Sequence, residues 1–175
     1  MWIIRDAERL IREMGKQFPV VFVTGARQVG KTSILTYLFP DFAYLTLDDP
    51  ARAAEAENAP HDLLDSLTYP VIIDEAQYVP DLFRHIKLIV DKTKRKGQFF
   101  MTGSQSFSLM QNLSESLAGR CGIINLQPLS AKGFKYLKEY YGKDSLLKGF
   151  VVCRVKKDFP IGEGIKAVNG IQFDF

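Results

Sequence analysis

Short apolar segments alternate with helical patterns along most of the chain. The segment at residues 19–24, PVVFVT, is rich in β-formers and apolar on both faces, which predicts a buried strand of a parallel sheet. Four more strands are predicted at residues 42–47, 71–73, 98–102 and 122–126. Because strands and helical segments alternate, the pattern favours an α/β fold whose parallel sheet is covered by helices on both sides.

Apolar residues at helical spacing predict the helices between these strands. Residues 3–17 form an amphipathic helix, which Gly15 is expected to help end, with apolar positions Ile3, Ile4, Ala7, Leu10, Ile11 and Met14. Shorter helices are predicted at residues 32–39, 50–57 and 61–67. A longer helix at residues 81–94 carries an apolar stripe made of Leu82, Phe83, Ile86, Leu88, Ile89 and Val90.

The pattern changes after Pro128. Residues 131–148 combine lysines with tyrosines, which predicts a basic-aromatic helix or linker. Residues 149–175 are β-rich and contain turn glycines. We therefore expect a core over residues 1–130, the linker over residues 131–148, and a short β-rich tail over residues 149–175.

Composition narrows the class of protein only slightly. The 175 residues are 46% hydrophobic and 25% charged, as in a globular protein with one main core. The net charge of +3 is too small to indicate nucleic-acid binding by itself. Cys121 and Cys153 lack zinc-type spacing, so a reducing cytoplasm is expected. Since there is neither an apolar leader nor an apolar run long enough to cross a bilayer, we expect no membrane insertion or secretion.

The most informative motif follows the first predicted strand directly. Residues 25–32 match the Walker A pattern GxxxxGK[ST], in which backbone N–H groups and a helix N-terminus surround a phosphate. Lys31 would reach the β- and γ-phosphates, and the Thr32 hydroxyl would ligate Mg²⁺. The predicted phosphate-binding residues are Gly25, Ala26, Arg27, Gln28, Val29, Gly30, Lys31, Thr32 and Ser33. The alternative is a glycine-rich turn with a purely structural role.

Two further strands end in polar residues. The strand at residues 71–73 is followed by Asp74 and Glu75, which fits a Walker B pair. Asp74 would hold the water shell of Mg²⁺, and Glu75 would orient or deprotonate the attacking water. The strand at residues 98–102 would direct Thr102, Ser104 or Gln105 at the γ-phosphate as a sensor, unless these residues only form a turn.

The candidate catalytic residues come from these motifs and from one arginine. Arg120 is included because a guanidinium near the transferring phosphoryl group stabilises its charge, although an arginine before a strand is often only a surface residue. No Asn-Lys-x-Asp motif for guanine follows the acidic strand, so we expect ATP as the nucleotide. The catalytic set is therefore Lys31, Glu75, Ser104 and Arg120.

Five segments of the chain resemble prokaryotic AAA-type (AAA+) P-loop ATPases that join an N-terminal ATPase core to a C-terminal, restriction-endonuclease-like domain of unknown function. The segments are GARQVGKTS, LDDP, IIDEAQYVPDLF, MTGSQSF, and LSESLAGR followed by LQPLS. The last is the most specific, because a generic P-loop protein requires neither half of it. The resemblance extends over residues 3–134. It implies a three-layer P-loop NTPase sandwich with a parallel sheet of about five strands, ordered 5-1-4-3-2.

The resemblance also implies roles for individual residues. It makes Lys31 and Thr32 the phosphate and magnesium residues, Asp74 and Glu75 the acidic pair, Ser104 the sensor, and Arg120 a γ-phosphate contact. Family members are longer than this chain, and residues 149–168 are similar to their extreme C-terminal strands. The resemblance therefore implies a family member with an internal deletion, in which the helical lid and most of the C-terminal domain are missing.

From these features we expect an AAA-type core that binds ATP and Mg²⁺ and hydrolyses ATP slowly or only with a partner, since the lid is missing. One alternative is a catalytically silent remnant that only binds nucleotide or self-associates. Another is a nucleic-acid-binding protein that uses the stretch after residue 131 together with Lys92, Lys94, Arg95 and Lys96. The expected partners are therefore a nucleotide, a second copy of the chain and, with the least support, nucleic acid.

Overall fold

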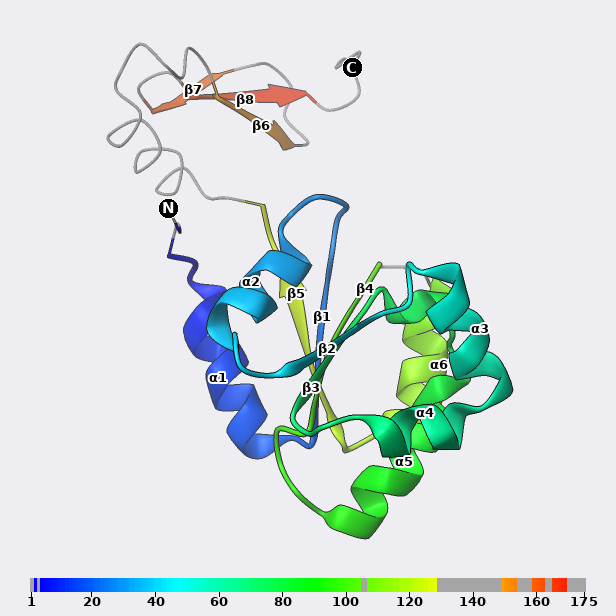
Figure 1. Cartoon of the computed structure of the whole chain (residues 1–175). Helices are drawn as coiled ribbons and strands as arrows, with labels where there is room; N and C mark the ends of the chain where they lie inside the picture. Colours follow the sequence, from blue (N-terminus) through cyan, green and yellow to red (C-terminus); the bar gives the residue numbers. More distant parts are fainter. Residues whose placement is uncertain are drawn as a thin grey trace. The chain divides into compact units, whose positions relative to one another are not determined.

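The computed structural model describes residues 2, 4–104, 107–128, 149–153, 159–162 and 165–169 (Figure 1). The chain divides into two compact units, which are treated separately below. One unit is Asp6–Pro128, and the other consists of Met1–Arg5 and Leu129–Phe175. The predicted linker at residues 131–148 and the candidate sensor Gln105 lie outside the described residues.

A five-stranded sheet forms the centre of the unit Asp6–Pro128. Its strands are β1 (Val20–Gly25), β2 (Ala43–Thr46), β3 (Val71–Asp74), β4 (Phe99–Gly103) and β5 (Cys121–Leu126). Their order is β2-β3-β4-β1-β5, and every neighbouring pair is parallel. This is the predicted order 5-1-4-3-2, so the P-loop sandwich is confirmed. In such a sheet, ligands bind at the carboxyl ends of the strands, where the chain reverses its direction of winding.

Helices cover both faces of this sheet, as predicted. Helices α1 (Ala7–Gln17) and α2 (Lys31–Leu38) lie on one face. The other face is covered by α3 (Pro50–Asn58), α4 (Pro60–Ser66), α5 (Leu82–Thr93) and α6 (Phe107–Leu117), as Figure 1 shows. A short 3₁₀ helix, η1 (Ala76–Tyr78), follows β3. No helix in the described part of the chain has both the length and the apolar character required to cross a membrane.

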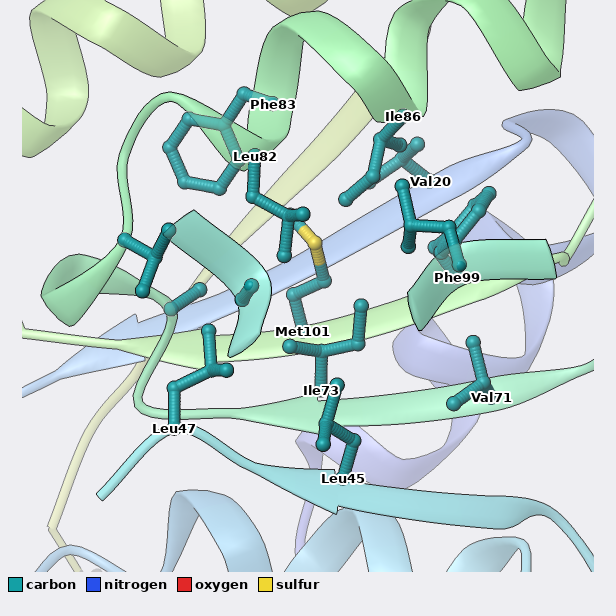
Figure 2. Packing of buried hydrophobic residues seen from close by; sticks show 14 of the residues in the cluster. Val20, Leu45, Leu47, Val71, Ile73, Leu82, Phe83, Ile86, Phe99 and Met101 are labelled. Atoms are coloured by element: carbon teal, nitrogen blue, oxygen red, sulfur yellow. The ribbon is translucent and has the colours of Figure 1, made fainter. Parts of the chain in front are cut away.

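The core forms because the central strands are buried on both faces. All residues of β1, β3 and β4 are buried, which explains their nearly continuous apolar sequences. Phe22 of β1 meets Phe83 of α5 edge to face, with ring centroids 6.3 Å apart. Figure 2 shows the surrounding cluster, which includes Ile73 and Met101 of adjacent strands and Leu82 of α5. This core fixes the ends of β1, β3 and β4 relative to one another.

The structure corrects three expectations about the helices. Gly15 does not end α1, which continues to Gln17. A side chain there would place its Cβ 2.8 Å from Phe100 Cζ, so glycine is needed for the close approach of helix and sheet. Leu88 does not belong to the buried stripe of α5, because 57% of it is exposed. The N-terminal helix also begins at Ala7 rather than at residue 3.

The second unit contains a separate small sheet. Its strands are β6 (Gly149–Cys153), β7 (Phe159–Gly162) and β8 (Ile165–Asn169), in the order β6-β8-β7. β6 and β8 are parallel, whereas β7 and β8 are antiparallel. All three strands lie within the segment for which the sequence predicts a β-rich tail.

Candidate nucleotide-binding site

The loop between β1 and α2 has the backbone geometry of an anion site. Gly25 has φ of 151°, and a Cβ there would lie 2.5 Å from the Leu126 carbonyl oxygen, so only glycine fits beside β5. Gln28 and Gly30 are left-handed, with φ of 60° and 85°. Gly30 caps α2 without a side-chain hydrogen bond, which leaves the first amides of the helix available to a ligand.

Lys31 is the first residue of α2, and only 7% of it is exposed. Its Nζ donates to the carbonyl oxygens of Ala26 at 3.0 Å and of Gly25 at 3.4 Å. No carboxylate of the described residues forms an ion pair with it. The loop therefore holds a buried cation whose partners among the described residues are two neutral carbonyl groups. Burying a charge without a counter-charge is costly, so this cation fits a site that receives an anion.

Asp74 ends β3, close to the first turn of α2. Its Oδ1 accepts hydrogen bonds from Thr32 Oγ1 at 2.7 Å and from Thr102 Oγ1 at 2.5 Å. Its Oδ2 accepts from the Tyr44 hydroxyl at 3.0 Å. Desolvation and then the negative charge of Asp74 raise the pKa of Tyr44 to about 12, so the phenol keeps its proton and remains a donor. Asp74 is 6% exposed and is held in one orientation by three hydroxyl groups.

Glu75 follows β3 directly and lies beside the end of β4. Its backbone is left-handed, with φ of 54°, and its N–H donates to Thr102 Oγ1 at 3.1 Å. Gln77 Nε2 donates to the Glu75 carboxylate. Gln77 Oε1 in turn accepts from the Ser104 N–H at 3.1 Å. The structure thus joins Glu75 and the Ser104 backbone into one hydrogen-bonded group at the carboxyl edge of the sheet.

Arg120 lies where the strands of the sheet begin, opposite the carboxyl ends that carry the other candidate residues. Its carbonyl oxygen accepts from Val20 N at the beginning of β1, while the phosphate loop follows the end of that strand, about 16 Å away along it. Its guanidinium binds both carboxylate oxygens of Asp91 on α5, at 2.5 and 3.0 Å. This contact lowers the pKa of Asp91. Within one chain, Arg120 is therefore not brought together with the other candidate site residues.

The donor set fits a nucleoside triphosphate with a magnesium ion. The loop Gly25–Gly30 can supply amides, and Lys31 supplies a buried positive charge. Thr32 offers a hydroxyl ligand, and Asp74 offers a carboxylate next to it. No group of three or more His, Cys, Asp or Glu side chains that could hold a metal occurs in the described part of the chain. Magnesium would therefore depend on phosphate oxygens and water for the rest of its shell.

Three contributions to this site were not predicted from the sequence. Thr102 was proposed only as a γ-phosphate sensor, but its hydroxyl is fully buried against Asp74. Tyr44 and Gln77 were not singled out, although both contact the acidic pair. For Tyr44 the available signal was its position on β2, the strand that lies next to β3 in the predicted order. Gln77 follows Glu75 by two residues, which places its amide within reach of that carboxylate.

Comparison with known proteins identifies the family. A sequence model for an AAA domain matches residues 17–135 of the chain. The chain belongs to this AAA domain family. The membership confirms the resemblance to AAA-type P-loop ATPases that the motifs indicated, and it supports nucleotide binding by this AAA core.

Two mycobacterial relatives match part of the chain. The uncharacterized proteins Mb2031c of Mycobacterium bovis and Rv2008c of Mycobacterium tuberculosis are each 35% identical to the chain over 130 residues. The shared region is 73% of this chain but 29% of each relative. The chain therefore spans less than a third of the length of the curated relatives that it matches.

Two solved structures have folds similar to that of the chain. The Walker-type ATPase PABY2304 of Pyrococcus abyssi is similar with a TM-score of 0.56 and 17% identity, over 82% of this chain and 59% of that one. AMPPCP-bound DnaA from Aquifex aeolicus is similar with a TM-score of 0.53 and 14% identity, over 82% and 53%. At these identities the likeness shows a shared fold.

Proposed function

We propose that this AAA core binds ATP together with Mg²⁺ and hydrolyses it slowly or with the help of a partner. The observation that carries the proposal is the buried Lys31 ammonium, which has only neutral carbonyl partners among the described residues. A triphosphate would supply the missing negative charge at the point where the amides of the loop and of α2 converge. Water or a small neutral ligand would leave that charge uncompensated.

The other residues of the site have roles that follow from their positions. Thr32 would turn its hydroxyl from Asp74 to the metal, and Asp74 would hold the water shell of that metal. Bound Mg²⁺ would neutralise charge on the phosphate oxygens. Glu75 would take the proton of the attacking water, and Ser104, at the end of β4, would contact the γ-phosphate or that water. The Thr102 hydroxyl donates to the Asp74 carboxylate and accepts from the backbone N–H of Glu75.

The proposal is tested by the metal dependence of ATP binding in the Asp74→Asn variant. We expect Mg²⁺ to tighten the binding of ATP to the wild-type protein by about tenfold or more, and we expect Asp74→Asn to lose most of this gain. Asparagine retains the shape and one acceptor for Thr32 and Thr102, so the fold should be preserved. Calorimetric titrations with ATP in excess Mg²⁺ and in EDTA measure the effect.

The exposed Asp41 supplies the matched control for this experiment. Asp41→Asn removes the same charge far from the phosphate loop and should retain the full effect of Mg²⁺. The proposal fails if wild-type protein binds no ATP, or if EDTA leaves its affinity for ATP unchanged.

Arg120 can contribute to hydrolysis only from a second copy of the chain, because in its own chain it lies where the strands begin, away from the phosphate loop. We therefore expect Arg120→Ala to lower ATP hydrolysis by roughly tenfold or more at high protein concentration and to leave ATP binding unchanged. Mixing Arg120→Ala with Lys31→Met protein should restore activity, since one supplies the nucleotide site and the other the arginine. A mixture no more active than its separate components would exclude this role.

The remaining alternatives lead to different results in the same assays. A catalytically silent remnant would bind ATP but release no phosphate above the Glu75→Gln background. Nucleic-acid binding would fall steeply with added salt if the exposed residues Lys92, Lys94, Arg95 and Lys96 carried it. The origin of residues 149–175 in the last strands of a longer ancestor stays a prediction from the sequence.

A further inference from the structure

Gln77 makes two polar contacts that connect different parts of the site. Its Nε2 donates to the Glu75 carboxylate, and its Oε1 accepts from Ser104 N at 3.1 Å. A carboxylate at neutral pH can only accept a hydrogen bond, and a backbone N–H can only donate one, so the two partners fix the orientation of the amide. An amide side chain is one of the few groups that can satisfy both partners at once.

Glu75 is consequently held at both ends. Its N–H donates to Thr102 Oγ1 at 3.1 Å, and its carboxylate accepts from Gln77. Its backbone is left-handed, with φ of 54° and ψ of 45°, a conformation that is unfavourable for a residue with a side chain. Such a conformation persists when the surrounding contacts determine it, and it is concentrated at functional sites.

Both partners of Gln77 belong to the proposed reaction site, whereas neither of these two hydrogen bonds goes to the phosphate loop. Glu75 is the candidate general base, and Ser104 stands directly after β4, between the ends of β3 and β1 in the sheet order. A shift of the chain at Ser104 would be transmitted through the amide of Gln77 to the Glu75 carboxylate. The two hydrogen bonds of Gln77 thus connect the backbone position of Ser104 with the orientation of the Glu75 carboxylate.

We propose that Gln77 is a positioning residue for ATP hydrolysis, which directs the Glu75 carboxylate and ties it to the backbone at Ser104. The inference rests on the proposed function, because it requires Glu75 to activate water. It predicts that loss of the Gln77 amide slows the chemical step and leaves nucleotide binding intact. A Gln77 that merely stabilised the turn of η1 would lower the melting temperature without acting through Glu75.

The test compares wild type with Gln77→Met, Glu75→Gln and the double variant. Methionine has a similar length but makes neither polar contact. We expect Gln77→Met to keep the dissociation constant for ATP·Mg²⁺ within about twofold and to slow single-turnover phosphate release by roughly tenfold, as expected for a misdirected catalytic group. In the Glu75→Gln background the same substitution should change the rate by less than about twofold, because the group that it positions is gone.

Gln77→Glu separates the two contacts of the amide. A glutamate at this position still accepts from Ser104 N but repels the Glu75 carboxylate, so its rate should be at most that of Gln77→Met. Because its shape is nearly that of glutamine, this variant also carries the test if Gln77→Met does not fold. Calorimetry for ATP binding, a phosphate-release assay and thermal melting are applied to all variants.

Each outcome separates this inference from the proposed function. Wild-type rates in Gln77→Met or Gln77→Glu would overturn the inference, and so would equal losses of rate with and without Glu75. Wild-type protein that binds ATP but releases phosphate no faster than Glu75→Gln would overturn it as well, while ATP binding would stand. Wild-type protein that binds no ATP would refute the proposed function and, with it, the role of Gln77.

Discussion

Replacing Lys31 with methionine is expected to weaken ATP binding by on the order of 100-fold, equivalent to about 3 kcal/mol. The Lys31 ammonium donates hydrogen bonds to two carbonyl oxygens of the phosphate loop. In the complex, charged oxygens of the triphosphate would replace these neutral acceptors. Hydrogen bonds to charged groups are stronger than those between neutral groups, so removing the ammonium destabilises the complex with ATP much more than the free protein. Calorimetric titration of both proteins with ATP and Mg²⁺ measures the change.

The same substitution should leave the nucleotide-free protein as stable as the wild type or make it more stable. Methionine fills nearly the same space and removes a buried charge that has no counter-charge among the described residues. Thermal melting without nucleotide tests this, with the exposed Lys92→Met on α5 as the matched control for both assays. If Lys31→Met binds ATP as tightly as Lys92→Met does, the assignment of the phosphate loop is refuted.

The sheet could be predicted because its central strands are buried on both faces. The run at residues 19–24 can only lie in the interior, and residues 71–73 repeat the pattern. The strand order came from the family resemblance, since local patterns do not specify which strands become neighbours. The helix boundaries were predicted less well than the strands: the helix expected at residues 3–17 begins at Ala7.

The centre of the site could be predicted for a different reason. Lys31, Thr32 and Asp74 belong to motifs in which the type of each residue is dictated by the chemistry of phosphate and magnesium, and Thr32 does lie 2.7 Å from Asp74. Tyr44 and Gln77 belong to no such motif. Their roles depend on side-chain directions that become visible only when β2, β3 and β4 are assembled. Arg120 also belongs to a motif of the family resemblance. That motif does not reveal that the residue lies where the strands begin, away from the phosphate loop.

Replacing Glu75 with glutamine is expected to slow ATP hydrolysis by about 10² to 10⁴-fold, the usual contribution of general acid–base catalysis, while ATP binding stays within about twofold of the wild type. Glutamine has the same shape and can still meet the amide of Gln77, but it cannot accept a proton from water. The backbone contact from residue 75 to Thr102 does not involve the side chain, so the turn after β3 should be retained. Single-turnover phosphate release and calorimetry measure the two quantities separately.

The exposed Glu57 on α3 provides the matched control, since Glu57→Gln makes the same chemical change away from the site and should hydrolyse ATP at the wild-type rate. The role of Glu75 is decided by comparing the effect of Glu75→Gln on ATP binding with its effect on the rate of hydrolysis. A variant that lost both would show that the carboxylate holds the nucleotide or its metal, whereas one that lost neither would show that another group activates the water. Only intact binding with a slowed chemical step agrees with a base that lies beside Asp74, the proposed magnesium residue, but does not itself bind the phosphates.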